Sequence, residues 1–518
     1  MSMSKNISIK KITWIIAAAA GVSLVFGAVF QWGTMAGSFG PGFLSSSLLF
    51  FLSGLGLVFV WKKAGGGKAL AWMMALSFIL RVVLGVLLIW GLPRFGYDTP
   101  VQQSGFVFED AHRRERNAWN LAQSGDSLIT ALDDELGTDQ YGGMLALSAL
   151  VYRTISSDAF RPGLITILAA AAMSLSIPFF VVSARKWFNS KAAIWAGWIL
   201  ALYPEGILLG ASQMREPFYI LFTCILFWAA SNWLQRSRRK WVLPIFVMTA
   251  LVFSLFSYRA AIPAVGVILL WVWVMQLRGL EKRWIRILGW GLVGLGILGI
   301  WFVFRDWLGE AMHWDILLTV RASGMVQFQL ERLPQWLHLP FITVYGLFQP
   351  VLPAAIAVRA PWIWKFLSIF RSAGWYAMMP LLIYGAVRVR KERDQNKRGF
   401  VLILLISVLV WTVISSARAG GDQWDNPRYR TIFIPWMALI AGWGINFASE
   451  TRDRWLGRWL LVMGIFLFFF TEWYVSRYFP VIPRPEFWVV ILLIVLFSSG
   501  VIIFGLWRDR KRKTNTSD

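Results

Sequence analysis

Stretches of about twenty mostly apolar residues recur from one end of this chain to the other, and hydrophobic residues fill 57% of its 518 positions. The hydrocarbon core of a bilayer is about 30 Å thick, so a helix of about 20 apolar residues is long enough to cross it. The sequence therefore predicts an all-α polytopic membrane protein with about 14 transmembrane helices. The predicted spans cover residues 12–32, 43–61, 69–92, 163–184, 191–210, 217–234, 241–257, 261–277, 287–304, 366–388, 399–416, 431–449, 458–476 and 487–507.

The net charge of +24 would suit a nucleic-acid-binding protein if the basic residues formed one patch, but they are spread along the chain. Lys and Arg are concentrated in alternate connections between the predicted spans, beginning with the N-terminus, and Lys365 is the one lysine on the opposite side. Loops rich in Lys and Arg face the cytoplasm. We therefore predict an integral cell-membrane protein with both termini in the cytoplasm, and the charge gives no reason to expect a nucleic-acid partner. The single cysteine, Cys224, excludes an intramolecular disulfide.

The connections on the predicted cytoplasmic side are too short to form a catalytic domain, so we expect chemistry in the longer extracytoplasmic loops. Phe341–Val358 is apolar but contains Pro350 and Pro353. Counting it as a span would break the alternation of charge, so we expect it to be re-entrant or to lie on the membrane surface. The sequence thus predicts an N-terminal three-helix membrane segment (1–92), a first large extracytoplasmic loop with an acidic motif (93–162), a membrane core (163–304), a second extracytoplasmic loop (305–365), and C-terminal helices with a short cytoplasmic tail (366–518).

The first large loop contains an acidic pair, Glu109 and Asp110, at the start of a predicted helix. If 109–123 is helical, residues 111, 115, 118, 119 and 122 share one face, and all but Glu115 are apolar, which is typical of a helix lying on a membrane surface. The alternative is that the acidic residues form ordinary ion pairs with the arginines that follow, Glu109 with Arg113 and Asp110 with Arg114.

A second acidic candidate is Glu216, which lies beside Arg215 and directly before Pro217 in the stretch SQMREPF. Proline suits the first turn of a helix, and a carboxylate there is stabilised by the positive helix terminus, which would be a purely structural role. The functional alternative is a carboxylate that points into a cleft at the outer membrane face. Glu205, after Pro204, is a weaker candidate for the same cleft.

Arg428, Tyr429 and Arg430 lie where the chain re-enters the membrane from the predicted outer side. Arginine suits a phosphate because its planar fork donates two parallel hydrogen bonds and stays charged. Interfacial tyrosine and arginine anchors are also common in membrane proteins and are the alternative. Arg81 lies near the middle of a predicted span, where a charge is costly and indicates an interior contact or a cavity. The sequence contains no paired His/Cys spacing for zinc, no P-loop and no GxSxG motif.

Three stretches resemble the polyprenyl-phosphate-sugar-dependent glycosyltransferases of the GT-C superfamily, which includes protein O-mannosyltransferases, aminoarabinose transferases and RgtA/B/C/D-like enzymes. They are FEDAHRRERNAW, YPEGILLGASQMREPFYILF (203–222) and, more weakly, DNPRYRTIFIPWMALIAGWGI (425–445). Two features depart from that pattern. Two extra helices precede the acidic loop, and no sizeable soluble C-terminal domain follows, which argues against an oligosaccharyltransferase.

The resemblance implies a GT-C-like fold with extracytoplasmic loops that carry surface helices, and an enzyme that is expected to be inverting. Asp110, with Glu109, would be the general base or hold a divalent metal such as Mg²⁺ or Mn²⁺, and Glu216 matches the second acidic position. The residues expected at the donor phosphate are Arg428, Arg430, Arg215 and Tyr429.

The expected function is transfer of a sugar from a polyprenyl-phosphate donor to a hydroxyl of a lipid, glycan or protein acceptor, on the extracytoplasmic face of the bilayer. One alternative is an O-antigen polymerase or ligase, which uses the same class of donor but has its key residues in a later outer loop, here Arg305–Lys365. The other is a polytopic transporter of lipid or polysaccharide; against it, polar residues concentrate in unequal outer loops rather than at mid-membrane sites.

Overall fold

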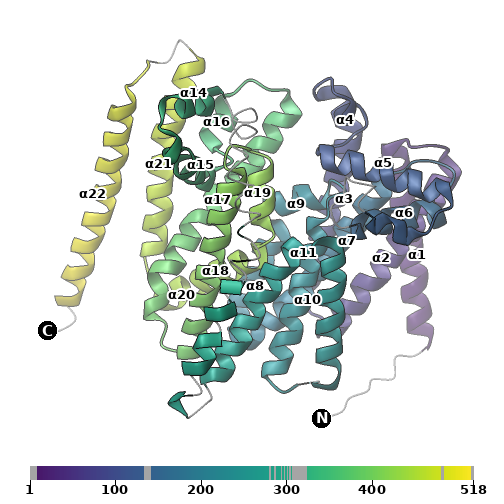
Figure 1. Ribbon diagram of the computed structural model, residues 1–518, viewed down its shortest axis with the longest axis horizontal. Coiled ribbons are helices and arrows are strands. Elements are labelled where there is room, and N and C mark those ends of the chain that lie inside the picture. Colours follow the sequence, from purple (N-terminus) through teal and green to yellow (C-terminus); the bar gives the residue numbers. More distant parts are fainter. Residues whose placement is uncertain are drawn as a thin grey trace. The chain divides into compact units, whose positions relative to one another are not determined.

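The computed structural model describes residues 9–133, 142–237, 239–278, 324–479 and 483–514, together with scattered positions between 282 and 305. These residues form helices joined by short turns, and no strand occurs among them (Figure 1). The predicted all-α class is therefore confirmed. The chain divides into two units, which are described separately: unit 1 comprises Met1–Ser183 and Leu200–Val265, and unit 2 comprises Ala184–Ile199 and Gly266–Asp518.

The helices before residue 280 are α1 (Ile9–Thr34), α2 (Phe39–Lys63), α3 (Lys68–Phe95), α4 (Pro100–Gln103), α5 (Glu109–Ser124), the 3-10 helix η1 (Leu128–Leu132), α6 (Gly143–Ile155), α7 (Gly163–Trp187), α8 (Ser190–Leu202), α9 (Pro204–Gly210), α10 (Glu216–Leu234) and α11 (Arg239–Arg278). Those after residue 320 are α14 (Gly324–Arg332), α15 (Gln335–Phe348), α16 (Leu352–Ala357), α17 (Trp362–Arg388), the 3-10 helix η3 (Val389–Lys391), α18 (Gln395–Ala419), α19 (Asp425–Thr431), α20 (Ile434–Thr451), α21 (Trp455–Tyr478) and α22 (Phe487–Thr514). Helices α7, α8 and α11 each pass from one unit to the other.

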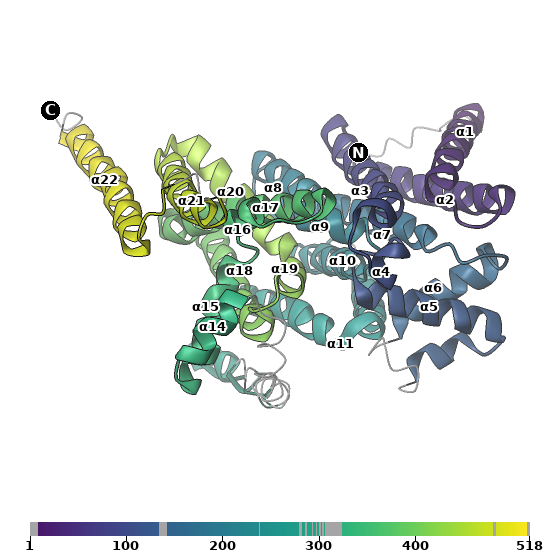
Figure 2. The same ribbon diagram turned by 90° about the horizontal axis from the view of Figure 1, so that it is seen from above.

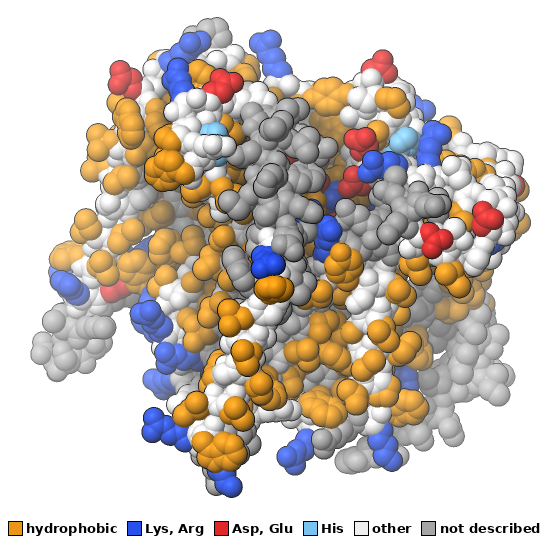
Figure 3. Space-filling model, viewed as in Figure 1, with side chains coloured by type: hydrophobic (Ala, Val, Ile, Leu, Met, Phe, Trp, Pro, Cys, Tyr) orange, Lys and Arg blue, Asp and Glu red, His pale blue; other side chains and the backbone are white. Residues whose placement is uncertain are grey.

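Nine helices among the described residues are long and apolar enough to cross a membrane. The number rises to eleven if each of two bent pairs, α8 with α9 and α19 with α20, makes one span. The protein is therefore an integral membrane protein, as predicted. In both units the side chains that cover the long helices are mostly hydrophobic, and charged side chains gather at the helix ends (Figure 3).

The predicted count of about 14 spans is not confirmed, and four of the predicted spans account for the difference. The span 12–32 falls in α1, whose apolar part covers Ala19–Thr34. The spans 241–257 and 261–277 both fall in α11, where Ser257 has extended dihedral angles (φ −173°, ψ 106°) and separates two helices. The span 287–304 is described only in part, and its described residues include the shorter apolar helix Ile287–Gly296. The division of the chain into five parts (1–92, 93–162, 163–304, 305–365 and 366–518) stays a prediction.

Helices α8 and α9 meet at an angle of 51° because Pro204 has no N–H with which to continue the hydrogen-bonded ladder. The fully buried Arg81 of α3 supplies donors at this break: its Nη1 lies 3.0 Å from the Ala201 carbonyl oxygen and its Nε 3.2 Å from that of Gly206. A Cβ at Gly210 would lie 2.5 Å from Arg81 Cδ, so glycine is required there. The predicted interior contact of Arg81 is therefore confirmed, and its partners are the main-chain carbonyls of Ala201, Gly206 and Ser77 and the Ser77 hydroxyl.

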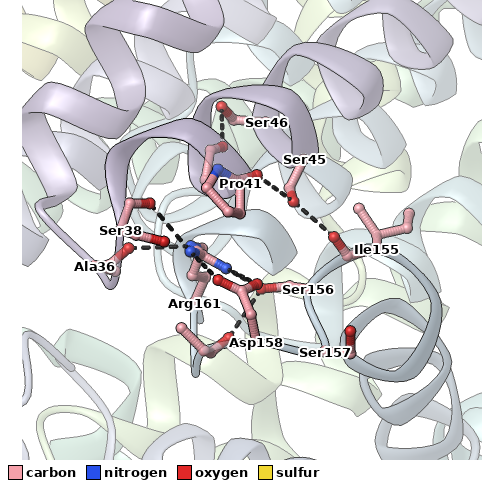
Figure 4. A network of polar contacts seen from close by, with 12 residues as sticks. Ala36, Ser38, Pro41, Ser45, Ser46, Ile155, Ser156, Ser157, Asp158 and Arg161 are labelled. Carbon is pink, nitrogen blue, oxygen red and sulfur yellow. Dashed lines mark hydrogen bonds and ion pairs between the residues drawn. The ribbon is translucent and has the colours of Figure 1, made fainter.

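In unit 1, α1 and α2 pack side by side (Figure 2) and are fixed to the loop after α6 by Arg161 (Figure 4). The Arg161 guanidinium is buried and donates from Nε to the Ala36 carbonyl (3.0 Å) and from Nη2 to the Ser38 carbonyl (3.2 Å). Its Nη1 also bonds Ser156 Oγ (2.8 Å) and Asp158 Oδ1 (2.6 Å). The hydrogen bond from Arg161 lowers the pKa of Asp158.

Helix α7, whose apolar segment is mostly buried, is the best-covered long helix of this unit.

In unit 2, α17 packs against α16, α20 and α21, whereas α22 contacts α21 and is mostly uncovered at the edge of the unit (Figure 2). The apolar segment Phe341–Val358 forms α15 and α16, two short helices separated at Gln349–Val351. Helix α15 packs on α18, and α16 packs on α17 and α21. The prediction that this segment is not a single transmembrane helix is therefore confirmed, while its position at the membrane stays a prediction.

Candidate active site

The predicted acidic helix is α5, which lies across the long helices of unit 1 rather than along them (Figure 1). Glu109 and Asp110 form its first turn, where the positive helix terminus stabilises carboxylates. The helix ends at Gly125, which has left-handed dihedral angles (φ 81°) typical of a helix C-terminus. The predicted helix over residues 109–123 is thus confirmed.

The face of α5 that we predicted to be apolar is buried, but it packs against α6. Ala111, Glu115 and Ala118 are 0% exposed, and the Trp119 ring contacts that of Tyr152 in α6, with the centroids 5.8 Å apart. The apolar residues of this face therefore pack on protein, and Glu115 is buried with them. Sequence reasoning did not recognise Glu115 as a candidate, although it is the one charged residue on this face.

The Glu115 carboxylate accepts three hydrogen bonds. Tyr152 donates to Oε2 (2.8 Å), while Ser148 Oγ (3.1 Å) and Arg114 Nε (3.3 Å) donate to Oε1. Burial raises the pKa of Glu115 and outweighs the Arg114 charge and the hydrogen bonds, which lower it. Burial and the neighbouring carboxylate raise the pKa of Tyr152 well above its usual value, so its hydroxyl keeps its proton and serves as a donor.

Arg114 connects α5 with the turn between α9 and α10. Its side chain is buried, and Nη2 donates a hydrogen bond to the main-chain carbonyl of Gln213. Gln213 has a positive φ of 48°, which is uncommon for a residue with a side chain, and its Nε2 donates to Thr166 Oγ1 of α7 (2.9 Å). Glu216 follows three residues later. The structure thus brings the two predicted acidic stretches, the start of α5 and the start of α10, to one corner of unit 1.

The acidic pair itself lies on the outer side of α5. Asp110 is about half exposed and pairs with Arg113, with 4.0 Å between Oδ1 and Nη2. Glu109 is exposed. The alternative that we considered was an Asp110–Arg114 ion pair; Arg114 instead points inward to Glu115 and Gln213.

His112 lies on the same first turns of α5 and contacts Arg116, with 3.2 Å between His112 Nε2 and Arg116 Nε. Burial and the Arg116 charge lower the pKa of His112, while Glu109 raises it. The Arg116 Nε–H donates to the unprotonated Nε2, so the imidazole is held neutral. Its ring also packs against Phe106, with the centroids 5.1 Å apart.

The second acidic position, Glu216, is the first residue of α10 and is only 1% exposed. Pro217 follows within the first turn, as predicted, and Arg215 precedes the helix as a partly buried N-cap residue. Glu205 has the same burial in the first turn of α9. Along the chain, Asp110 lies four residues before Arg114, and Arg215 and Glu216 lie two and three residues after Gln213, the residue that Arg114 contacts.

The other donor-phosphate candidates belong to unit 2, where they lie on the short helix α19. Arg428 is buried and pairs with Asp425 at 3.3 Å. Arg430 is also buried; its Nη2 donates to the Gln349 carbonyl (2.7 Å), and its guanidinium lies 3.4 Å from the centroid of the Trp375 ring. Both arginines thus have partners within the protein.

Tyr429 is partly exposed, and the Arg428 guanidinium lies 5.1 Å from the centroid of its ring. Its main-chain carbonyl accepts a hydrogen bond from Trp411 Nε1 of α18 (2.9 Å). Helix α19 is bent by 68° relative to α20, so the predicted span 431–449 begins with a break that places residues 428–430 on a separate short helix. The assignment of these residues to the donor phosphate stays a prediction.

Among the residues that the structure describes, no group of three or more His, Cys, Asp or Glu side chains could hold a metal ion. The assignment of Asp110 and Glu216 as metal ligands therefore stays a prediction. Magnesium is often held by one or two carboxylates together with substrate phosphate and water, so two carboxylates are chemically sufficient for such a site.

Neither a protein-family model nor a curated protein matches this chain. Two solved structures resemble it over most of its length. One is the archaeal oligosaccharyltransferase AglB from Archaeoglobus fulgidus in complex with an inhibitory peptide and a dolichol-phosphate: 13% of residues are identical, the TM-score is 0.39, and the match covers 86% of this chain and 55% of that one. The other is the apo form of the Archaeoglobus fulgidus oligosaccharyltransferase, with 11% identity, a TM-score of 0.38, and coverage of 83% and 55%.

The chain thus spans about half the length of the structures that it matches. Both are structures of an oligosaccharyltransferase.

Proposed function

We propose that this protein is a membrane glycosyltransferase that transfers a sugar from a polyprenyl-phosphate donor to an acceptor hydroxyl on the extracytoplasmic face. The observation that carries the proposal is the hydrogen bond from Arg114 to the Gln213 carbonyl. It joins α5, four residues after Asp110, to the turn before α10, three residues before Glu216, and this supports a shared role for the two carboxylates. An exposed carboxylate, a buried one and nearby arginines are the groups that this transfer requires.

In the proposed reaction, Asp110 is the general base. It accepts the proton of the acceptor hydroxyl while that oxygen forms a bond to the anomeric carbon of the sugar, and the bond from this carbon to the donor phosphate oxygen breaks. One displacement of this kind inverts the anomeric configuration. Asp110 suits the role because it is about half exposed and therefore accessible to an acceptor, and Arg113 lies 4.0 Å away.

The departing phosphate carries negative charge and requires positive groups beside it. Of the four predicted phosphate-binding residues, Arg215 adjoins Glu216 in unit 1, and we assign it the first contact with the phosphate. For Arg428, Arg430 and Tyr429, which belong to unit 2, a role in phosphate binding stays a prediction. A divalent cation such as Mg²⁺ or Mn²⁺, held by Asp110 and Glu216, would supply further positive charge at the same phosphate.

The membrane location fits this chemistry. A polyprenyl tail remains in the lipid while its sugar reaches water, so the reactive groups must lie at the end of a membrane-embedded bundle. Helix α5 crosses the long helices of unit 1 and carries Asp110 on its uncovered side (Figure 1). We propose that this end of unit 1 faces the extracytoplasmic side, as the distribution of Lys and Arg predicts.

The test is transfer of labelled sugar by purified protein in liposomes, with polyprenyl-phosphate sugars and nucleotide sugars offered separately, each with and without EDTA. We expect transfer from the lipid-linked donors alone. Glu216→Gln should abolish most transfer, whereas Asp126→Asn, which removes an exposed carboxylate directly after α5, should retain it. Polymerisation of lipid-linked oligosaccharide without monosaccharide transfer would instead support the polymerase or ligase alternative, and net movement of the donor across the bilayer would support a transporter.

A further inference from the structure

We propose that Arg114 and Glu115 form a positioning pair that holds the acidic first turn of α5 in register with the start of α10. Neither residue contacts the reacting groups. The inference rests on the proposed function, because the turn that the pair holds carries Asp110. Its structural part, that the pair fixes α5, can be tested separately from catalysis.

The first argument is the completeness of the network around the pair. Both side chains are almost fully buried, at 3% and 0% exposure. The carboxylate of Glu115 is bonded by Ser148 and Tyr152 from α6 as well as by Arg114. Because α6 contributes two donors to one carboxylate, rotation of α5 about its axis would break several hydrogen bonds at once.

The second argument is energetic. Burying an arginine and a carboxylate requires both to lose their hydration, and apolar residues of similar volume often give equal or greater stability. Stability alone therefore does not explain a buried Arg114–Glu115 pair on the otherwise apolar face of α5. What such a network supplies is a defined geometry, since each polar group must keep its partner.

The third argument is the destination of the Arg114 fork. Its Nη2 donates to the carbonyl of Gln213, the one residue of the α9–α10 turn with a positive φ. The Gln213 side chain is held from the other side by Thr166 of α7. The turn that leads into Glu216 is thus fixed by two helices, and one of them is the helix that carries Asp110. The pair links the positions of the two proposed catalytic carboxylates.

The expected size of the effect follows from geometry. Displacement of a catalytic group by about 1 Å can cost about 100-fold in rate. Loss of the pair leaves α5 attached through the packing of its small apolar residues, so we expect a shift of this order. The catalytic constant kcat should fall about 10- to 100-fold, while the donor KM changes little, because the groups that bind the donor remain.

Unit 1 offers a matched control in Arg161 (Figure 4). Like Arg114, it is a buried arginine outside the predicted spans that donates to main-chain carbonyls and to a nearby carboxylate, that of Asp158. It fixes α1 and α2 and has no contact with α5 among the hydrogen bonds described above. Arg114→Lys and Arg161→Lys keep the charge and remove the fork, and Glu115→Gln and Asp158→Asn remove one negative charge each.

The experiment measures kcat, donor KM, melting temperature and hydrogen exchange of α5 amides for these four variants and the wild type. Arg114→Lys and Glu115→Gln should lower kcat and speed exchange in α5. The two control variants should leave kcat within about twofold of wild type, even where they lower the melting temperature. If Arg114→Lys does not fold, Tyr152→Phe, which removes a single hydrogen bond to Glu115, should give a smaller loss in the same direction.

Three results would overturn the inference or its basis. Unchanged exchange in α5 would show that the pair does not fix the helix. Faster exchange with unchanged kcat would show that its position does not matter to catalysis. Absence of transfer in the wild type with every lipid-linked donor would refute the proposed function, and the exchange data would still decide whether the pair fixes α5.

Discussion

Replacing Asp110 by asparagine separates a catalytic carboxylate from a surface ion pair. The two side chains of the Asp110–Arg113 pair are 47% and 53% exposed, and their charged atoms are 4.0 Å apart. A pair so exposed contributes about 1 kcal/mol or less, because water and salt screen it. If the pair were the whole role of Asp110, Asp110→Asn would cost less than this in stability and leave transfer near normal.

A general base has a much larger effect. Its loss typically lowers the rate about 10²- to 10⁴-fold, which corresponds to about 2.7–5.5 kcal/mol of transition-state stabilisation. Asparagine has nearly the same shape as aspartate and cannot accept the proton. Asp110→Asn should therefore lose transfer by this factor while its melting temperature stays close to that of the wild type.

The assay is single-turnover transfer from a labelled polyprenyl-phosphate sugar in liposomes, with the melting temperature followed by tryptophan fluorescence. Asp126→Asn is the matched control, because Asp126 is an exposed aspartate directly after the same helix. Full transfer by Asp110→Asn, and separately by Glu109→Gln, would refute the assignment. Equal losses in Asp126→Asn would show that the effect is one of general surface charge.

Three further predictions concern topology, a buried arginine and pH. In a background without the native Cys224, cysteines introduced at Ser104 and Gln423 should react with an impermeant thiol reagent added from outside, and one at Ser237 should not. The opposite pattern would reverse the predicted orientation of the chain in the membrane. Arg430→Ala should weaken donor binding and also destabilise the protein by about 2–4 kcal/mol, because it leaves the buried Gln349 carbonyl and the Trp375 ring without their partner. An unchanged melting temperature would contradict these contacts. Burial raises the pKa of Glu115, so the contribution of this residue to stability is full below the unfolded pKa of about 4.3 and is lost as the pH rises through the folded pKa. Glu115→Gln should therefore remove this part of the dependence of the melting temperature on pH. An identical pH dependence in the variant and the wild type would refute the prediction.

The parts of the fold that follow from local physics were predictable. A run of about 20 apolar residues has few alternatives to a membrane-spanning helix, so most of the predicted spans correspond to observed helices. The helical period over residues 109–123 likewise placed α5, and a proline-interrupted segment predicted the break between α15 and α16. These features depend on residues close together in the sequence.

The parts that depend on distant partners were not predictable. Sequence spacing paired Asp110 with Arg114 across one helical turn, but Arg114 finds a partner 99 residues away in Gln213. The helical period placed Glu115 on one face of α5 but gave it no role, because its hydrogen-bond donors, Ser148 and Tyr152, lie on another helix. The spacing of residues along the sequence cannot show which of two neighbouring arginines turns inward.

The contacts of Arg81 have a consequence for how the chain enters the membrane during synthesis. Its carbonyl partners at Ala201 and Gly206 are made 120 and 125 residues later. At about 5–20 residues per second, the ribosome needs about 6–25 s to produce them. During that interval α3 has only Ser77 on its own helix to receive the guanidinium, at 2.7 Å from its hydroxyl. A charge near the centre of a bilayer costs several kcal/mol. We therefore expect α3 to remain at the translocon, or to return to it, until α8 and α9 arrive, so that these three helices enter the lipid together although more than 90 residues separate α3 from α8.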